Sequence, residues 1–475
     1  MSQVEMERHP SRFRWLRWIA PRLGLSLLGV LFAVVLFEGF IRAAWAFAGR
    51  GGSSHNIDSY CTPTEVVSLR PGENFTGFYQ FDELLARRWV PGARGIRNHD
   101  EEGTPVVYEA NEHGWRDISH TQEKPPGTFR IAVIGDSFGV AHGRPLNEAI
   151  ARQLEAWLNN AQRLDQHIEV VNLSMAGNTP VEYSLILRHE APRFDPDLIV
   201  ILLFTYNDVR ADLPGKTTVV DGHIRYTQEH LDYYRQLYTA SISGPGAGLT
   251  WDELEAARDE GRLIVAEETE DGVRSYQVRL AEPIDVPPGQ EFPCFLDRNL
   301  RSYTFLKVKM RNVVEGRAVN GVIATGMATY QASPDEATAA AWQLYEDLLV
   351  QMADDAAAQA TPIAFVTLAN GDQVYPELFA NGLATLWYSP DNYDANYPID
   401  RTEALCEQHD MICWWLLPAF RDAAANSDEQ LFGGYDPQSF VRTYWWGHYT
   451  AFGDALAART IGGHILEQDW IAPQP

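Results

Sequence analysis

Basic residues are scarce in this sequence. Its 475 residues include 38 Lys and Arg against 64 Asp and Glu, which gives a formal net charge of −26 at pH 7. Binding of nucleic acid through phosphates needs clusters of Lys and Arg, so we expect no nucleic-acid partner. The same deficit argues against docking of the folded part on an anionic membrane surface.

Signatures of bound cofactors are also missing. The sequence contains no Cys or His cluster with metal-ligand spacing, no glycine-rich phosphate loop and no nicotinamide or flavin fingerprint. We therefore expect neither a metal nor a cofactor, and side chains alone should carry any chemistry.

Cysteine is rare as well, with Cys61, Cys294, Cys406 and Cys413 the four in the chain. In an oxidising compartment they could form two disulfides. We pair Cys406 with Cys413 first, because they lie where a predicted helix turns into a predicted strand. Cys61 and Cys294 would then link the region after the N-terminal hydrophobic run to the middle of the chain. Four buried thiols are the alternative, since free Cys is readily buried.

One long hydrophobic run is present near the N-terminus. Residues 23–37 carry no charge, and beyond Glu38 and Arg42 the hydrophobic character continues to Phe47. This length can span a bilayer if Glu38 and Arg42 lie near the far interface. Their spacing of four places them on one helix face, where they could pair. We therefore predict a transmembrane helix over residues 23–48.

The charges that flank this run predict its orientation. Five arginines precede it and two follow closely, so the positive-inside rule predicts a cytoplasmic basic tail over residues 1–22 and an exported body, periplasmic or extracellular. The predicted location is the cytoplasmic (inner) membrane, crossed once. A cleaved signal peptide is the alternative, because Ala46-Phe47-Ala48 has the A-x-A form, and the body is exported in either case.

Buried-type strands alternate with helices along the rest of the chain. Continuous hydrophobic runs at residues 129–134, 168–173 and 198–204 are typical of buried parallel strands, and helical patterns separate them. Later elements expected from the same patterns are a helix at 334–357, a strand at 362–368, a helix at 401–409, a strand at 411–417 and a helix at 449–468. This alternation predicts a three-layer α/β/α fold with a mostly parallel sheet.

Composition also divides the chain into segments. Residues 49–127 read as a linker and an irregular lead-in segment. The α/β domain would consist of residues 128–209 and 336–475, with an insertion or cap at 210–335 where the alternation breaks. Elements expected within this insertion are a hairpin at Asp221-Gly222, a charged helix near 251–260 and a strand over 275–280.

The stretch FRIAVIGDSFG, residues 129–139, runs from a hydrophobic strand into the small-residue turn Gly135-Asp136-Ser137. Such a turn lies at the carboxyl edge of a parallel sheet, where open α/β folds bind ligands. A serine in this position can act as a nucleophile, with backbone N–H groups nearby to stabilise negative charge. An ordinary strand-to-helix turn with a capping serine is the alternative.

Further polar residues follow the next two strands. Gly177 and Asn178 come after the second strand, Asn207 comes after the third, and His448 directly precedes the final helix. Because the carboxyl ends of parallel strands share one edge of a sheet, we expect these residues to converge on Ser137. Of the 13 histidines, we expect His448 alone to have this placement, and His464 is the second candidate for a catalytic base.

These blocks resemble the SGNH/GDSL hydrolase family in order and position. The matching residues are Gly135-Asp136-Ser137-Phe138, Gly177, Thr205-Tyr206-Asn207-Asp208, with threonine where glycine is usual, and Trp446-Gly447-His448. The lead-in NEHGWRD followed by KPPGTFRI also resembles membrane-anchored members of this superfamily. The resemblance covers most of residues 105–470 and implies an SGNH or flavodoxin-like α/β/α fold with ester chemistry.

The resemblance also implies roles for individual residues. Ser137 would be the nucleophile, and His448 would accept its proton and return it to the leaving group. The backbone N–H groups of Ser137 and Gly177, together with the Asn207 side chain, would form the oxyanion hole. Residues expected to line the site are Asp136, Asn178 and Trp446.

One departure from the family concerns the group that orients the histidine. Trp445 and Trp446 stand where the family usually has an aspartate, and loss of that acid can lower turnover by several orders of magnitude. Asp428 or Asp436 could reach in from the preceding loop, or a backbone carbonyl could hold the Nδ1 proton in a Ser–His dyad. The tryptophans would pack in the core or form an aromatic platform for a sugar face.

The sequence therefore predicts a serine esterase or O-acyltransferase with an acyl-Ser137 intermediate. Export and anchoring favour an acylated cell-envelope glycan or lipid as substrate, and membrane-protein partners stay unknown. One alternative is a scaffold or accessory subunit that kept the fold without activity. Another is an α/β-hydrolase with GDSFG as its nucleophile elbow, which we disfavour because several strands usually precede the elbow and Asn207 would have no role.

Overall fold

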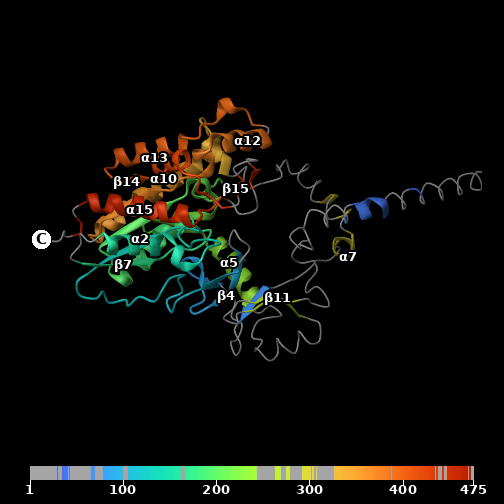
Figure 1. Cartoon of the computed structure of the whole chain (residues 1–475), viewed down its shortest axis with the longest axis horizontal. Coiled ribbons are helices and arrows are strands. Elements are labelled where there is room, and N and C mark those ends of the chain that lie inside the picture. Colours follow the sequence, from blue (N-terminus) through green and yellow to red (C-terminus); the bar gives the residue numbers. More distant parts are fainter. Residues whose placement is uncertain are drawn as a thin grey trace, which may run out of the picture. The chain divides into compact units, whose positions relative to one another are not determined.

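The structure is a computed structural model that describes most of the second half of the chain and little of its N-terminal part (Figure 1). The described residues are 29, 35–40, 42, 66–69, 79–99, 105–161, 166–242, 263–268, 274–278, 291–300, 302–303, 306–307, 326–386, 388–433, 435–436, 441–442, 447–468 and 470–471. The chain divides into two units, one of residues 1–64 with 279–317 and one of residues 65–278 with 318–475. We call the second unit the body.

A parallel sheet forms the centre of the body. Its strands are β6 (Thr128–Ile134), β7 (His167–Asn172), β8 (Leu198–Leu203), β13 (Ile363–Thr367) and β14 (Ile412–Trp415). They lie in the order β14–β13–β8–β6–β7, and every neighbouring pair is parallel. This is the doubly wound order 2-1-3-4-5, whose topological switch point lies between β6 and β8. The predicted α/β fold with a parallel sheet is confirmed.

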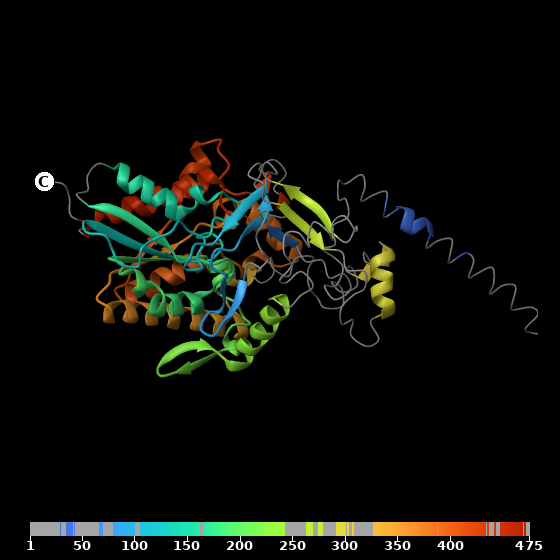
Figure 2. The same cartoon turned by 90° about the horizontal axis from the view of Figure 1, so that it is seen from below.

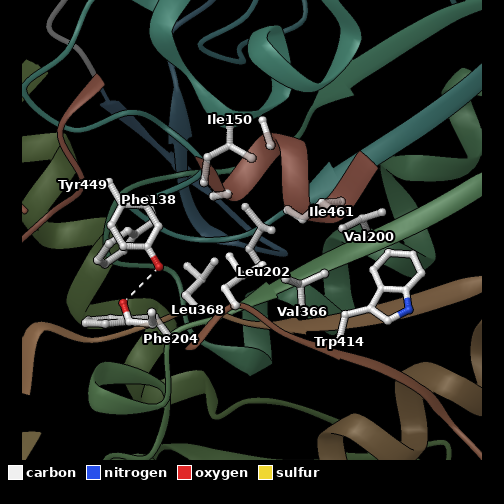
Figure 3. Packing of buried hydrophobic residues seen from close by; sticks show 14 of the residues in the cluster. Phe138, Ile150, Val200, Leu202, Phe204, Val366, Leu368, Trp414, Tyr449 and Ile461 are labelled. Atoms are coloured by element: carbon white, nitrogen blue, oxygen red, sulfur yellow. Dashed lines mark hydrogen bonds between the residues drawn. The ribbon is translucent and has the colours of Figure 1, made fainter. Parts of the chain in front are cut away.

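Every residue of β6 and β8 is buried, as expected of parallel strands covered on both faces. Their side chains alternate between two hydrophobic clusters: Ile131 and Val200 belong to one, Ala132 and Ile199 to the other. Figure 3 shows part of the first cluster. Among the helices that contribute residues to these clusters are α2 (Ile150–Asn160) and α15 (Ala451–Glu467) for the first, and α3 (Pro180–His189) and α10 (Glu336–Ala358) for the second.

The helices on each face are in direct contact with one another. A Cβ atom at Gly462 of α15 would overlap the Trp157 ring of α2, so glycine permits these two helices to approach closely. On the other face, Gln351 Nε2 of α10 donates a hydrogen bond to Ser184 Oγ of α3 over 2.7 Å. The sheet is therefore covered by one helix layer on each side (Figure 1).

Small antiparallel sheets accompany this core. The β9–β10 hairpin turns at Asp221 and Gly222, both with positive φ, which confirms the predicted hairpin. It leads into α5 (Gln228–Ile242), which contacts β2 and β3 (Figure 2). The strands of these small sheets are β1 (Val66–Leu69), β2 (Tyr79–Asp82), β3 (Ala86–Trp89), β4 (Arg94–His99), β5 (Pro105–Glu109), β9 (Thr217–Val220), β10 (His223–Tyr226), β11 (Leu263–Glu268) and β12 (Arg274–Val278).

The second half of the body contains helices that the sequence patterns did not predict. The strand expected over 411–417 ends at Trp415, because Leu417 begins a helix with Pro418 in its first turn. Helix α13 (Tyr397–Gln408) begins earlier than expected. The unpredicted helices of this half are α11 (Gly371–Val374), α12 (Pro376–Leu386) and α14 (Leu417–Asn426). Earlier in the body, α4 (Thr205–Asp208) and α5 were not predicted either. Two short paired strands, β15 (Tyr435–Asp436) and β16 (Val441–Arg442), precede α15.

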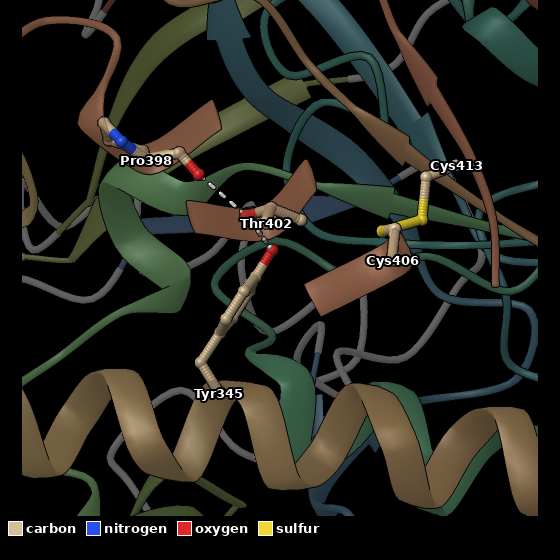
Figure 4. The surroundings of a disulfide bond; sticks show 5 residues. All are labelled: Tyr345, Pro398, Thr402, Cys406 and Cys413. Atoms are coloured by element: carbon tan, nitrogen blue, oxygen red, sulfur yellow. Dashed lines mark hydrogen bonds between the residues drawn. A yellow bond between two sulfur atoms is a disulfide. The ribbon is translucent and has the colours of Figure 1, made fainter. Parts of the chain in front are cut away.

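A disulfide joins Cys406 near the end of α13 to Cys413 of β14 (Figure 4), as predicted. The two Cα atoms are 6.3 Å apart. Cys294 is disulfide-bonded too, whereas Cys61 lies outside the described residues. The alternative of four free thiols is therefore wrong.

The first unit is described in short pieces. Its helix α7 spans Glu291–Asn299. Glu38 and Arg42 form the expected pair, with Arg42 Nε 2.6 Å from Glu38 Oε1. No helix among the described residues is long and apolar enough to cross a membrane. Most of residues 23–48, and the helix expected near 251–260, lie outside the described ranges, so the transmembrane helix stays a prediction.

Candidate active site

The loop after β6, residues 135–144, carries Ser137 at the switch point of the sheet, and we call it the nucleophile loop. Asp136 Oδ1 accepts a hydrogen bond of 2.9 Å from the Phe138 N–H, which closes a tight turn around Ser137. Gly135 allows this turn to pack on β8, because a Cβ atom there would lie 3.0 Å from Leu202 Cβ. The side chain of Ser137 is half-buried.

The Ser137 hydroxyl contacts an imidazole from the other end of the chain. His448 Nε2 and Ser137 Oγ are 2.8 Å apart, although the residues are 311 positions apart in the sequence. This is the contact that a serine nucleophile and its general base require. Both side chains are only partly buried, so a substrate can reach them.

Packing positions the imidazole of His448. The Gly433 N–H donates to the His448 carbonyl over 2.7 Å. The neighbouring Tyr449 is buried, and its hydroxyl donates to the Ala369 carbonyl over 2.9 Å (Figure 3). The Phe138 ring contacts both residues, with centroids 4.9 Å from the imidazole and 4.7 Å from the phenol. The base is therefore held in place by contacts from several elements.

The three donors expected of an oxyanion hole follow the neighbouring strands β6, β7 and β8. Among the described residues, the N–H groups of Ser137 and Gly177 donate to no protein acceptor. Gly177 is exposed and has a φ of +76°. Asn207 of α4 is half-buried, and its Nδ2 donates to Asp136 Oδ2 over 2.8 Å. This contact fixes the amide beside the turn that carries Ser137.

Two buried carboxyl groups lie next to these donors. Burial raises the pKa of Asp136 from 3.8 to about 6, although hydrogen bonds from Asn207 and Phe138 lower it. Burial also raises the pKa of Asp208, with a further contribution from the charge of Asp136. Asp208 accepts a hydrogen bond of 3.0 Å from the Tyr183 hydroxyl. No group of three His, Cys, Asp or Glu side chains in the described part of the chain could hold a metal ion.

Other predicted site residues are placed differently. Asn178 is 1% exposed, so it lies beneath the surface of the site and does not line it. Within the described ranges, neither end of its amide has a hydrogen-bond partner. Asp428 is exposed and forms no ion pair or hydrogen bond with His448 in the part of the chain that the structure describes. Outside the described residues lie Trp445, Trp446 and the side chain of Asp436.

A second histidine lies at the site, which the sequence analysis missed. The ring centroids of His142 and His448 are 4.8 Å apart, with the ring planes inclined by 32°. The backbone N–H of His142 donates a hydrogen bond to the Ser137 carbonyl over 3.1 Å. Ala141 has a φ of +54°, which turns the nucleophile loop back on itself. No sequence periodicity could reveal this placement, because it depends on how the loop folds.

The motif NEHGWRD in the lead-in segment holds the nucleophile loop. The guanidinium of Arg116 is buried and lies over the Tyr108 ring, 3.7 Å from its centroid. It donates hydrogen bonds to three carbonyls of the loop, those of Val140, Ala141 and Arg144. The motif was visible in the sequence, but its contact with this loop was not.

An arginine from the lead-in segment lies beside Gly177. A Cβ atom at Gly177 would lie 3.0 Å from Nη2 of Arg87, which is in β3. The same guanidinium donates to the Ala176 carbonyl. A positive charge is therefore present next to one donor of the expected oxyanion hole, and no sequence motif indicated it.

Comparisons with known proteins find a likeness in structure only. No family model and no curated protein matches the chain. The chain is similar to solved GDSL/SGNH-type hydrolases. One is a putative lipolytic protein of the G-D-S-L family from Desulfitobacterium hafniense, with 8% identity and a TM-score of 0.30 over 70% of this chain and 98% of that chain.

Two further solved structures show a likeness of similar extent. A lipase/acylhydrolase from Enterococcus faecalis has 11% identity and a TM-score of 0.32, over 73% of this chain and 99% of that chain. An acetylxylan esterase from Geobacillus stearothermophilus has 12% identity and a TM-score of 0.31, over 72% and 96%. Scores this low carry no argument about activity, so the functional conclusion depends on the geometry of the site.

Proposed function

We propose that the protein is a serine ester hydrolase or O-acyltransferase that carries the acyl group on Ser137. The observation that supports this most directly is the 2.8 Å contact between Ser137 Oγ and His448 Nε2. The N–H groups of Ser137 and Gly177 and the amide of Asn207 supply donors for the charge that develops on the ester oxygen.

In the first half of the reaction, Ser137 Oγ attacks the carbonyl carbon of the ester while His448 Nε2 takes the hydroxyl proton. The carbonyl electron pair moves onto oxygen, where the three donors stabilise it. The intermediate then collapses, the bond to the leaving oxygen breaks, and His448 returns its proton to that oxygen. The products are an alcohol and acyl-Ser137.

In the second half, an O–H group attacks the acyl-Ser137 carbonyl and His448 accepts its proton. Collapse breaks the bond to Ser137 Oγ, which takes the proton back from His448. Water as the attacking group gives a carboxylic acid and a hydrolase, whereas a hydroxyl of an acceptor gives a new ester and a transferase. The same residues serve both reactions.

The proposal places this chemistry outside the cytoplasm, on an acylated glycan or lipid of the cell envelope. Disulfides persist in oxidising compartments, so the Cys406–Cys413 bond and the bonded state of Cys294 support export. The anchor predicted over residues 23–48 supports a substrate at the membrane surface.

Turnover of p-nitrophenyl acetate tests the proposal. The wild-type protein should release p-nitrophenol, and Ser137→Ala and His448→Ala should each lower kcat/KM by about 10³-fold or more. His464→Ala is a matched control, because this histidine stacks on Trp414, with ring centroids 5.4 Å apart, and does not contact Ser137. No turnover by folded wild-type protein, or equal turnover by Ser137→Ala, would favour the scaffold alternative.

A further inference from the structure

We propose that helix α7 and the basic stretch after it form a second contact with the membrane, in which Phe292 and Phe295 enter the interface of an anionic bilayer. The first contact is the transmembrane anchor predicted over residues 23–48. The inference goes beyond the proposed function and does not depend on it, because no step of the ester chemistry involves these residues. It concerns the first unit of the chain alone.

Hydrogen bonds join the end of α7 to the end of the N-terminal hydrophobic run. Arg42 Nη2 donates to the Asn299 carbonyl over 3.0 Å, and the Ser302 N–H donates to Glu38 Oε2 over 2.7 Å. Glu38 directly follows the charge-free residues 23–37. A charged residue in this position marks the level at which a spanning helix leaves the hydrocarbon core. Asn299 and Ser302 would therefore lie beside the lipid headgroups.

Helix α7 turns aromatic rings outward. Phe292 and Phe295 lie three positions apart, and therefore on one face of the helix, and they are 67% and 55% exposed. Cys294, on another face, is completely buried and disulfide-bonded. A surface helix in water shows the reverse arrangement, with its hydrophobic face buried and its polar face outside. The outward face of α7 therefore suits an apolar surrounding.

Exposed hydrophobic side chains are concentrated in the first unit. Six of the nine large hydrophobic side chains that are strongly exposed among the described residues belong to it, although most described residues belong to the body; the six are Val35, Leu36, Phe40, Phe292, Phe295 and Leu306. Such a concentration marks a contact with a protein or a membrane. Because three of the six lie at the end of the predicted anchor, a bilayer is the partner that would cover both groups.

The local charge suits an anionic bilayer. The net charge of −26 argues against docking of the folded part as a whole on such a surface, but residues 298–311 (RNLRSYTFLKVKMR) contain five Lys and Arg and no Asp or Glu. Over 291–311 these five basic residues stand against Glu291 and Asp297 alone. Aromatic and basic residues together are the composition of segments that lie in the membrane interface.

Photocrosslinking in the full-length chain tests the contact. Phe292 and Phe295 are replaced, one at a time, by benzoylphenylalanine, and the protein is reconstituted into nanodiscs of phosphatidylcholine with phosphatidylglycerol. After irradiation, mass spectrometry should find lipid adducts at both positions. Tyr233 of α5, which is 61% exposed in the body, is the matched control and should give no lipid adduct after the same replacement.

Lipid charge provides the second readout. In nanodiscs of phosphatidylcholine alone, the yield of lipid adduct at position 295 should fall at least about threefold, because each basic residue near an anionic surface contributes about 1 kcal/mol of attraction. The variant Arg301→Gln/Lys307→Gln/Lys309→Gln should give this low yield in both kinds of nanodisc.

A second triple variant controls for the loss of charge as such. Arg193→Gln/Arg225→Gln/Arg459→Gln removes three basic side chains from exposed positions of the body and should keep the dependence on phosphatidylglycerol. Alkylation and intact-mass analysis should find Cys294 disulfide-bonded in every variant, so that all comparisons are made on folded protein.

Three results would overturn the inference. Adducts of positions 292 and 295 with protein alone would make this face of α7 a protein interface. Equal lipid adducts from position 233 would show that the contact is not specific to α7, and a yield that ignores lipid charge would remove the role of the basic stretch. None of these readouts uses turnover, so failure of the proposed esterase would leave the membrane contact standing.

Discussion

Asp136 accepts hydrogen bonds from the Phe138 N–H and from Asn207 Nδ2, yet its side chain is completely buried. Burial raises its pKa from 3.8 to about 6. The folded state therefore binds this proton more tightly than the unfolded chain does. As the pH rises from about 4 to about 6, the contribution of Asp136 to the free energy of unfolding falls. Above pH ~6 the buried carboxylate lowers the free energy of unfolding by about 3 kcal/mol.

The substitution Asp136→Asn should remove this cost. The free energy of unfolding of the variant, relative to wild type, should rise by about 2–3 kcal/mol between pH ~4 and ~7, as measured by urea unfolding. The exposed Asp428→Asn is the control and should show no such rise. A difference that does not change with pH would contradict a carboxylate that ionises while buried.

Asn207 should act mainly in the transition state. Asn207→Ala should lower kcat for p-nitrophenyl acetate by about 10²–10³-fold, the usual effect of losing one oxyanion donor. KM should change little, because the missing hydrogen bond forms only as charge develops. Asn426→Ala, at an exposed position of α14, is the control. An unchanged kcat would exclude Asn207 from the oxyanion hole.

At the scale of elements, the lead-in segment forms part of the site. The Tyr108 hydroxyl of β5 accepts from the Gly143 N–H over 2.7 Å, and Arg116 binds three carbonyls of the same loop. The carboxylate of Asp117 accepts from the Asn172 N–H at the end of β7 over 2.7 Å. Segments before the sheet thus fix the loop that places Ser137 and His142.

Replacing the Arg116 guanidinium with an amine should loosen this loop. Arg116→Lys loses the planar set of donors, so the free energy of unfolding should fall by about 1–3 kcal/mol. The kcat for p-nitrophenyl acetate should fall too, because His142 would no longer be held against His448. Urea unfolding and the kinetic assay measure both effects. Arg193→Lys, at a surface ion pair, should change stability by less than about 0.5 kcal/mol; an equal effect of the two substitutions would contradict the role of Arg116.

The Cys406–Cys413 disulfide links α13 to the edge strand β14 (Figure 4). Replacing both cysteines by Ala should lower the free energy of unfolding by about 2–3 kcal/mol, the value expected for a short closed loop. Urea unfolding under oxidising conditions measures this loss. Because two strands, β13 and β8, separate β14 from β6 in the sheet, kcat should be retained. A large loss of turnover would show that α13 and β14 influence the site.

Sequence patterns predicted the elements whose residues are buried on every side. The continuous hydrophobic runs of β6 and β8 identified central strands, and the turn at Ser137 followed from the end of β6. The short helices α11 and α14 were missed because tertiary packing, and not periodicity, determines them. The contacts of Arg87 and His142 were missed because each joins segments that no local pattern relates.

At the scale of the whole molecule, the body brings residues from the whole length of the fold to one edge of a parallel sheet. Ser137 follows β6, Asn207 follows β8, and His448 arrives just before the last helix. The order 2-1-3-4-5 places the first two at the switch point, where open α/β folds bind ligands.

Intact-mass analysis after treatment with a fluorophosphonate probe tests the central claim most directly, because the probe reacts with an activated serine. Wild-type protein should gain one adduct that peptide mapping assigns to Ser137, Ser137→Ala should gain none, and His448→Ala should react far more slowly. Folded wild-type protein that gains no adduct, or gains it on another residue, would contradict a nucleophile formed by Ser137 and His448.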